Sequence, residues 1–122
     1  MASQNERNQQ LSLDAKRMRV VATGSSDGID ANTVFAFRQS GETVWASYSG
    51  GNIVQGFLIG TAHGSQLEFD YIQVTRAGRR DKGASNCTLE RSPDTGLLQL
   101  TERFQWASRE NHGVNRLQEL GD

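Results

Sequence analysis

Glu102 is the residue whose position in this sequence most strongly suggests chemistry. It interrupts a stretch in which every second residue is apolar, since Leu98, Leu100, Phe104 and Trp106 occupy the matching positions. A carboxyl group that points with these side chains into an apolar interior is costly unless it is paired or hydrogen-bonded. Burial would also raise its pKa, which suits a group that exchanges protons with a substrate. An ion pair with an arginine across the sheet, or an exposed position, is the structural alternative.

Three aromatic residues share the alternating positions of the apolar residues in their segments: Tyr48, Tyr71 and Trp106. Their rings offer stacking area and their polar tips offer hydrogen bonds, so they could form the walls of a ligand pocket. In an enzyme, Tyr48 or Tyr71 would polarise an oxygen of the substrate. Filling of the core is the alternative role for all three.

Uncharged polar residues could orient a ligand in such a pocket. Gln73, Ser85 and Gln105 each carry groups that form hydrogen bonds in fixed directions. Residues of these types more often face solvent, so an outward position is the alternative. Together with Glu102 and the aromatic residues, they form the predicted ligand-binding set.

Histidine and cysteine provide weaker signals. His63 and His112 lie in predicted loops without a nearby acidic cluster, so we expect surface positions and no metal site. Cys87 is the single cysteine, which excludes an intramolecular disulfide. We expect it to act as a small buried hydrophobic residue, because no histidine is placed to activate its thiol.

Composition limits the classes of function. The chain has 122 residues, which suits one domain, and 13 Lys and Arg balance 14 Asp and Glu to a net charge of −1. This balance argues against a nucleic-acid partner, which usually selects a basic excess. The densest basic stretch, residues 76–82 (RAGRRDK), could contact an anion but is predicted to be a solvated turn flanked by Asp70 and Asp81. No apolar run approaches the ~20 residues of a membrane helix, and the N-terminus does not resemble a signal peptide. We therefore expect a cytoplasmic protein without a membrane partner.

Turn residues divide the chain into short segments rich in strand-forming residues. Residues 1–16 are polar and rich in Gln and Asn, and we expect a flexible tail there, followed by one domain over residues 17–122. Eight segments follow at residues 18–22, 33–39, 43–48, 52–61, 66–75, 82–91, 97–108 and 114–120. Short loops can join only antiparallel neighbours, and a meander of eight strands closes naturally into an up-and-down barrel. The predicted fold is therefore an all-β, eight-stranded antiparallel barrel, with an open two-sheet sandwich as the alternative.

Glycines inside the predicted strand at residues 52–61 support curvature. Gly56 and Gly60 fall on one face of this strand, where glycine usually marks a bend or a close approach of another group. A barrel of eight strands has an interior wide enough for side chains or one small ligand.

Several motifs resemble a family of small bacterial proteins that is described as avidin-like, with a calycin-type barrel. The motifs are residues 33–41 (TVFAFRQSG), 46–53 (ASYSGGNI), 56–60 (GFLIG), 71–73 (YIQ), 102–106 (ERFQW) and Glu119. The resemblance covers roughly residues 32–120 and implies a barrel with a cavity. Many members carry the label N-acetylglutamate synthase. Acetyl transfer from acetyl-CoA usually needs a phosphate-binding loop at a helix N-terminus, and no βα unit is predicted in this chain. We therefore expect no cofactor.

Three hypotheses of function follow. The first is a binding module that holds a small hydrophobic or aromatic ligand in its lumen. The second is a cofactor-free enzyme, an isomerase or cyclase, in which Glu102 acts as acid and base. The third is a filled barrel that acts only in protein association through exposed Trp45, Ile53 or Leu117. A homodimer or homotetramer is compatible with each of them.

Overall fold

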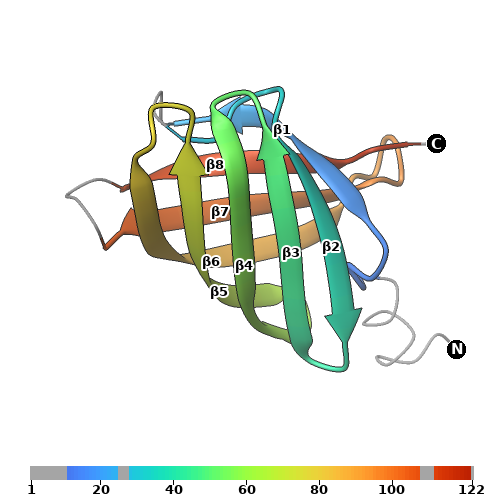
Figure 1. The fold of residues 1–122 in the computed structure, drawn as a ribbon. Helices are drawn as coiled ribbons and strands as arrows, with labels where there is room; N and C mark the ends of the chain where they lie inside the picture. Colours follow the sequence, from blue (N-terminus) through green and yellow to red (C-terminus); the bar gives the residue numbers. More distant parts are fainter. Residues whose placement is uncertain (1–10, 25–27, 108–111, 122) are drawn as a thin grey trace, which may run out of the picture.

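The computed structural model describes residues 11–24, 28–107 and 112–121, except for the side chain of Trp106. These residues form a closed antiparallel barrel in which each strand pairs with its neighbours in the chain and β1 pairs with β8 (Figure 1). The strands are β1 (Arg17–Thr23), β2 (Val34–Ser40), β3 (Thr43–Gly50), β4 (Ile53–His63), β5 (Gln66–Thr75), β6 (Arg80–Arg91), β7 (Leu98–Trp106) and β8 (His112–Glu119). The predicted eight-stranded barrel is confirmed.

The alternation of side chains determines which residues line the interior. In β5, the buried positions Leu67, Phe69, Tyr71 and Gln73 alternate with exposed ones. This period of two is the geometry of a strand with one face on a core, so the pattern seen in the sequence becomes the inner wall of the barrel.

Glycines on the inner wall give room to the aromatic rings of neighbouring strands. Gly56 lies opposite Tyr48, and a Cβ at this glycine would collide with the tyrosine ring. Gly83 lies opposite Tyr71 in the same manner. The rings can therefore lie along the wall over the bare glycine backbone, an arrangement known to support strands that contain glycine. Gly56 marks a close approach, as predicted for this position.

The loop between β1 and β2 is anchored to the β3–β4 turn. The Asp30 carboxylate accepts hydrogen bonds from the backbone N–H groups of Asn32 (2.8 Å) and Asn52 (3.0 Å). Gly51 has a φ of 60°, and a Cβ at this position would collide with the Asp30 side chain. Glycine is required here by both the backbone angle and the contact. The anchored loop carries Ile29 to one end of the barrel.

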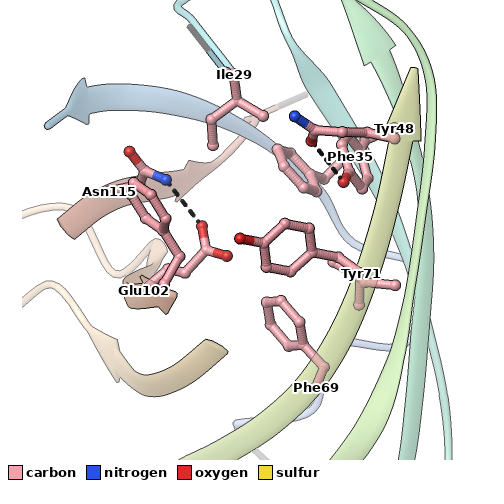
Figure 2. A pocket seen from close by; sticks show the side chains of 11 residues that line it. Ile29, Phe35, Tyr48, Phe69, Tyr71, Glu102 and Asn115 are labelled. Atoms are coloured by element: carbon pink, nitrogen blue, oxygen red, sulfur yellow. Dashed lines mark hydrogen bonds between the residues drawn. The ribbon is translucent and has the colours of Figure 1, made fainter. Parts of the chain in front are cut away.

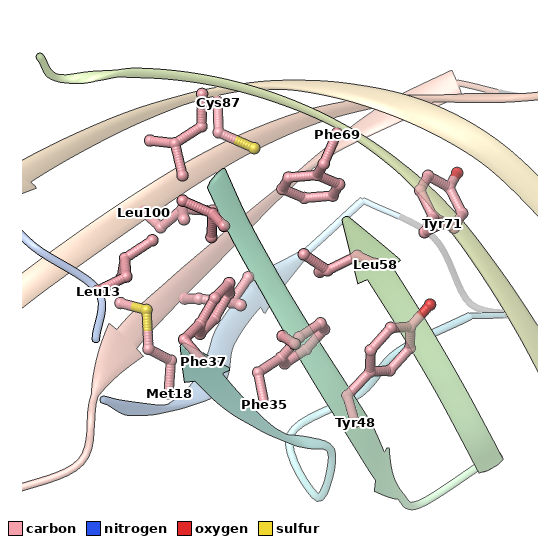
Figure 3. Packing of buried hydrophobic residues seen from close by; sticks show 14 of the residues in the cluster. Leu13, Met18, Phe35, Phe37, Tyr48, Leu58, Phe69, Tyr71, Cys87 and Leu100 are labelled. Carbon is pink, nitrogen blue, oxygen red and sulfur yellow. The ribbon is translucent and has the colours of Figure 1, made fainter. Parts of the chain in front are cut away.

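The interior has two chemically different halves. Figure 3 shows the buried hydrophobic cluster, with Leu13 and Met18 toward one side and the Tyr48 and Tyr71 rings toward the other. The apolar half is filled by aliphatic and aromatic side chains together with Cys87: Leu13, Met18, Phe37, Val44, Leu67, Leu89, Leu98, Leu100 and Leu117. The polar half contains buried hydrogen-bonding residues: Tyr48, Tyr71, Gln73, Asp81, Ser85, Glu102 and Asn115. Burial raises the pKa of the Cys87 thiol, which keeps it protonated and gives it the character of a small apolar side chain.

Residues before β1 contribute to the apolar half. Leu13 is fully buried, and its backbone N–H donates to the Gln39 side-chain oxygen at 3.0 Å. Lys16 forms an ion pair of 3.2 Å with Glu119 at the end of β8. Residues 11–16, which the sequence pattern assigned to a tail, thus pack on the barrel, whereas residues 1–10 lie outside the described part and a tail there stays a prediction.

Candidate functional site

Glu102 lies at the centre of the polar half, between the strands that pair with β7. The Ser85 hydroxyl on β6 donates to one carboxyl oxygen at 2.6 Å, and the Asn115 amide on β8 donates to the other at 3.1 Å. The Thr23 hydroxyl on β1 donates to the Asn115 oxygen at 2.6 Å. This last bond turns the amide nitrogen of Asn115 toward Glu102, so four strands hold the carboxyl in one orientation.

The surroundings of Glu102 shift its protonation. Burial raises the pKa of this carboxyl, and the hydrogen bonds from Ser85 and Asn115 oppose that shift in part. Both of these donors are neutral, whereas the ion-pair alternative predicted an arginine. A buried carboxyl held by neutral donors can take up or release a proton when a ligand changes its environment.

Tyr48 and Gln73 form a second polar pair. The Tyr48 hydroxyl donates to the Gln73 side-chain oxygen at 2.9 Å, and the Tyr48 ring stacks on Phe35 with centroids 4.4 Å apart. Burial, and then the negative charge of Glu102, raise the pKa of Tyr48, so that its hydroxyl remains a donor. The Gln73 amide nitrogen is buried and has no hydrogen-bond partner among the described residues. A buried donor in this state costs about 1–3 kcal/mol, which a ligand with an acceptor would recover.

Aromatic side chains enclose the space between these two polar groups. Phe35, Tyr48, Phe69, Tyr71 and Phe104 line the same pocket as Glu102, Gln73 and Asn115. Figure 2 shows the Tyr71 hydroxyl pointing toward Glu102. In this view Ile29 lies above these two residues and Phe69 lies below Tyr71. The pocket leaves about 20 Å³ for the centre of a water molecule, which is room for about one water. A larger ligand must displace part of the wall. Gly28 and Ile29 line the pocket from the loop between β1 and β2, and Ile29 contributes a side chain that could move.

Most of the predicted ligand-binding set comes together here, and one member does not. Tyr48, Tyr71, Gln73, Ser85 and Glu102 are all buried in the polar half. Gln105 is exposed on the outer face, because it alternates with the buried Phe104, so its placement in the lumen was wrong. The side chain of Trp106 lies outside the described part, and its role stays a prediction.

Sequence reasoning missed two polar residues of the polar half, and it also missed the apolar wall residues Ile29, Phe35, Phe69 and Phe104. Asn115 alternates with the buried Leu117 on β8, and this spacing was a usable signal for an inward side chain. Asp81 was assigned to a solvated turn, but it lies inside β6 with an exposed fraction of 2% and pairs with Arg79 at 3.0 Å. Its inward position follows from alternation with Gly83 and Ser85. The charged residues of the stretch 76–82 favoured the interpretation as a solvated turn, so the alternation was not recognised.

Among the other residues with a predicted surface position, some are exposed and others are buried. His63 and His112 are exposed, as expected, and His63 pairs with Glu42 at 2.5 Å. Of the proposed association anchors, Trp45 is exposed, whereas Ile53 and Leu117 are buried and cannot contact a partner. The described residues contain no group of three potential metal-ligating side chains.

Comparisons with known proteins agree with the fold. The described part of the chain contains no helix with the length and apolar character needed to cross a bilayer. Neither the curated proteins nor the solved structures include a match to this chain. A family model described as "Avidin-like protein" matches residues 11–120, which is nearly the whole sequence. This chain belongs to the family of avidin-like proteins.

Proposed function

We propose that the protein binds a small organic molecule in the polar half of its barrel. The observation that carries this proposal is the buried Gln73 amide nitrogen, which has no hydrogen-bond partner in the described part of the chain and lies in the same pocket as the Glu102 carboxyl. A ligand acceptor at Gln73 and a ligand donor at Glu102 would satisfy both groups. The aromatic walls suit a compact, largely apolar ring.

The chemistry of the lining narrows the ligand class. A cyclic amide or urea presents an N–H donor beside a C=O acceptor on one edge of a small ring. That edge complements a carboxyl acceptor and an amide donor, while the remaining ring atoms contact Phe35, Tyr71 and Phe104. The ligand would take the space that the Ile29 side chain now covers, so its affinity depends on the cost of moving Ile29.

A fragment series tests the proposal. Titration of 2-piperidone, its N-methyl derivative and methylcyclohexane, followed by ligand-observed NMR, separates the donor from the acceptor. We expect the affinity to fall along that order, because the second compound lacks the N–H donor and the third also lacks the C=O acceptor. Gln73→Met should weaken 2-piperidone binding by up to about tenfold, the value of one hydrogen bond. Ile29→Ala should strengthen 2-piperidone binding, because the shorter side chain leaves more space at the loop end of the pocket.

Gln105→Met provides the matched control for Gln73→Met, because it makes the same exchange on the outer face of the barrel. It should leave fragment binding unchanged. Equal loss of binding in both variants, or no binding of any fragment together with no small molecule released on denaturation of the purified protein, would contradict the proposal.

A cofactor-free enzyme, an isomerase or cyclase, is the second candidate, and the raised pKa of Glu102 beside the Tyr71 hydroxyl favours it. In that case Glu102 would move a proton on the bound substrate while Tyr48 or Tyr71 polarises an oxygen. Glu102→Gln separates the two functions. It should remove turnover and preserve binding in an enzyme, but should change only the affinity in a binding protein.

A further inference from the structure

Thr23, at the end of β1, is the outermost member of the chain of hydrogen bonds that reaches Glu102. Its hydroxyl donates to the Asn115 side-chain oxygen at 2.6 Å, and the Asn115 amide nitrogen donates to Glu102 at 3.1 Å. Figure 2 shows this amide directed at the carboxyl. Asn115 and Glu102 are buried, whereas Thr23 is exposed. A residue near the surface is thus linked to the buried carboxyl through one amide.

A β-bulge in β1 gives Thr23 this inward direction. Val20 pairs with Leu117 and Ala22 pairs with Arg116, so two steps along β1 match one step along β8. Strict alternation from the buried Val20 would direct Ala22 inward and Thr23 outward. The extra residue exchanges these two faces, and bulges next to functional sites commonly re-aim a side chain in this way.

The part of β1 after the bulge stays paired with β8. Thr23 is the register partner of Asn115, so their side chains lie on the same side of the sheet. The Gly24 backbone N–H donates to the Val114 carbonyl oxygen at 2.9 Å, and a Cβ at Gly24 would lie only 3.1 Å from that oxygen. This close pairing keeps the Thr23 hydroxyl against the Asn115 amide.

The direction of the Asn115 amide decides which hydrogen bond it offers to Glu102. With its oxygen bonded to Thr23, the amide presents N–H groups, which favour the carboxylate because that form can only accept. A turned amide would present its oxygen and favour the protonated carboxyl instead. The Thr23 hydroxyl also polarises the amide, which strengthens the bond from the amide to the carboxylate.

We propose that Thr23 is a positioning residue of the ligand site: through Asn115 it keeps Glu102 a hydrogen-bond acceptor, so that the site selects ligands with an N–H or O–H donor. The selection of ligands rests on the proposed function. The effect of Thr23 on Glu102 does not, because the hydrogen bonds that transmit it are formed in the protein without a ligand.

Other titratable groups face Glu102 from β3, β5 and β6. Cys87 is its register partner, the Tyr71 hydroxyl points toward it in Figure 2, and the negative charges of Glu102 and Asp81 both act on Tyr48. Burial raises the pKa of Cys87 and that of Tyr48, so both groups stay neutral while Glu102 titrates. A midpoint measured at the Glu102 carboxyl therefore reports the protonation of Glu102 itself.

Carbon-13 NMR titration of the Glu102 carboxyl in the ligand-free protein tests the effect of Thr23, and Glu102→Gln assigns the resonance. We expect Thr23→Val to raise the titration midpoint by about one pH unit, because the carboxylate loses the support of one hydrogen bond. Thr23→Ser keeps the hydroxyl and should restore the midpoint. Thr61→Val makes the same exchange at an exposed position of β4 and should leave the midpoint unchanged. Thr23→Ala replaces Thr23→Val if circular dichroism shows that the latter does not fold.

The ratio of the affinities for 2-piperidone and its N-methyl derivative tests the selection of ligands. We expect this ratio to fall by about threefold or more in Thr23→Val and to recover in Thr23→Ser, because only 2-piperidone carries the donor that Glu102 accepts. Identical Glu102 titration curves in the unmodified chain and Thr23→Val, a midpoint that Thr23→Ser does not restore, or an unchanged affinity ratio would overturn the inference. A midpoint that depends on Thr23 in a protein that binds neither fragment would support the positioning role and contradict the proposed function.

Discussion

The apolar and polar halves of the barrel interior are built from the same strands but follow opposite rules. In the apolar half, Leu13, Phe37 and Leu100 are buried with exposed fractions of 0–1%, and their side chains present no hydrogen-bonding groups. In the polar half, Glu102 is buried against neutral donors and Gln73 retains a donor without a partner among the described residues. Burial of apolar side chains in the first half stabilises the fold, whereas the buried polar groups of the second half lower the free energy of unfolding.

This difference indicates where selection for function acts. A barrel selected only for stability would fill both halves with apolar side chains, because buried polar groups without full partners lower the free energy of unfolding. Departures from that rule are expected at functional sites. The polar half is thus the region that the proposed ligand would complete, and the apolar half is the support that keeps its walls in place.

Truncation of one side chain in each half should show the largest contrast. Leu100→Ala in the apolar half should lower the free energy of unfolding by about 2–5 kcal/mol, because the closed packing around it cannot collapse into the cavity. Ile29→Ala, at the loop end of the polar half, should cost less than about 2 kcal/mol, because the vacated space lies at the end of the barrel, where water can enter it. Urea denaturation measures both. Equal costs would remove the distinction between the halves.

The pH dependence of stability should come from the polar half. The pKa of Glu102 is raised in the folded protein above its ordinary value of 4.5. The folded state therefore keeps a proton that the unfolded state releases, so the contribution of Glu102 to stability is full below about pH 4.5 and is lost as the pH rises through the raised pKa. The difference in stability between the unmodified chain and Glu102→Gln should fall with pH by up to about 1.4 kcal/mol per unit.

Glu119 has a pKa shift of the opposite direction and does not enter that difference. Burial acts to raise its pKa, but hydrogen bonds from the Leu98 backbone and Lys16 lower it overall. Its contribution is therefore lost as the pH falls, the opposite sign to that of Glu102. It is present in both proteins and cancels in their difference. A pH-independent difference would show that Glu102 does not change protonation on folding.

A double-mutant cycle on Tyr48 and Gln73 should give the smallest effect. Tyr48→Phe removes the donor to Gln73 and should cost about 0.5–1.5 kcal/mol, since both ends of the amide are then unsatisfied. Gln73→Met added to Tyr48→Phe should recover most of that loss, because no buried polar group remains there. Thermal unfolding of the four proteins measures the coupling. A double variant less stable than Tyr48→Phe would show that Gln73 has a partner in the polar half.

Much of the fold could be predicted from local sequence. The period-two alternation in β3, β5 and β7, and the turn residues between them, are properties of neighbouring residues, so they predict strands without knowledge of the fold. The same alternation correctly placed Tyr48, Tyr71 and Glu102 on inward faces. The surface positions proposed for Ile53 and Leu117 did not come from this alternation, and both residues are buried.

What the sequence by itself determined about this protein is therefore the number of strands, their order and, for most of them, the inward face. The tertiary structure alone decided which residues meet across strands: Glu102 with Ser85 and Asn115, Tyr48 with Gln73, and Trp45 with Ile59. These pairs depend on the stagger between strands and on closure of β1 against β8, which brings together residues such as Thr23 and Asn115, 92 positions apart in the chain. Alternation is a property of one strand, whereas a binding site is a property of strand register, and register is established only when the whole barrel closes.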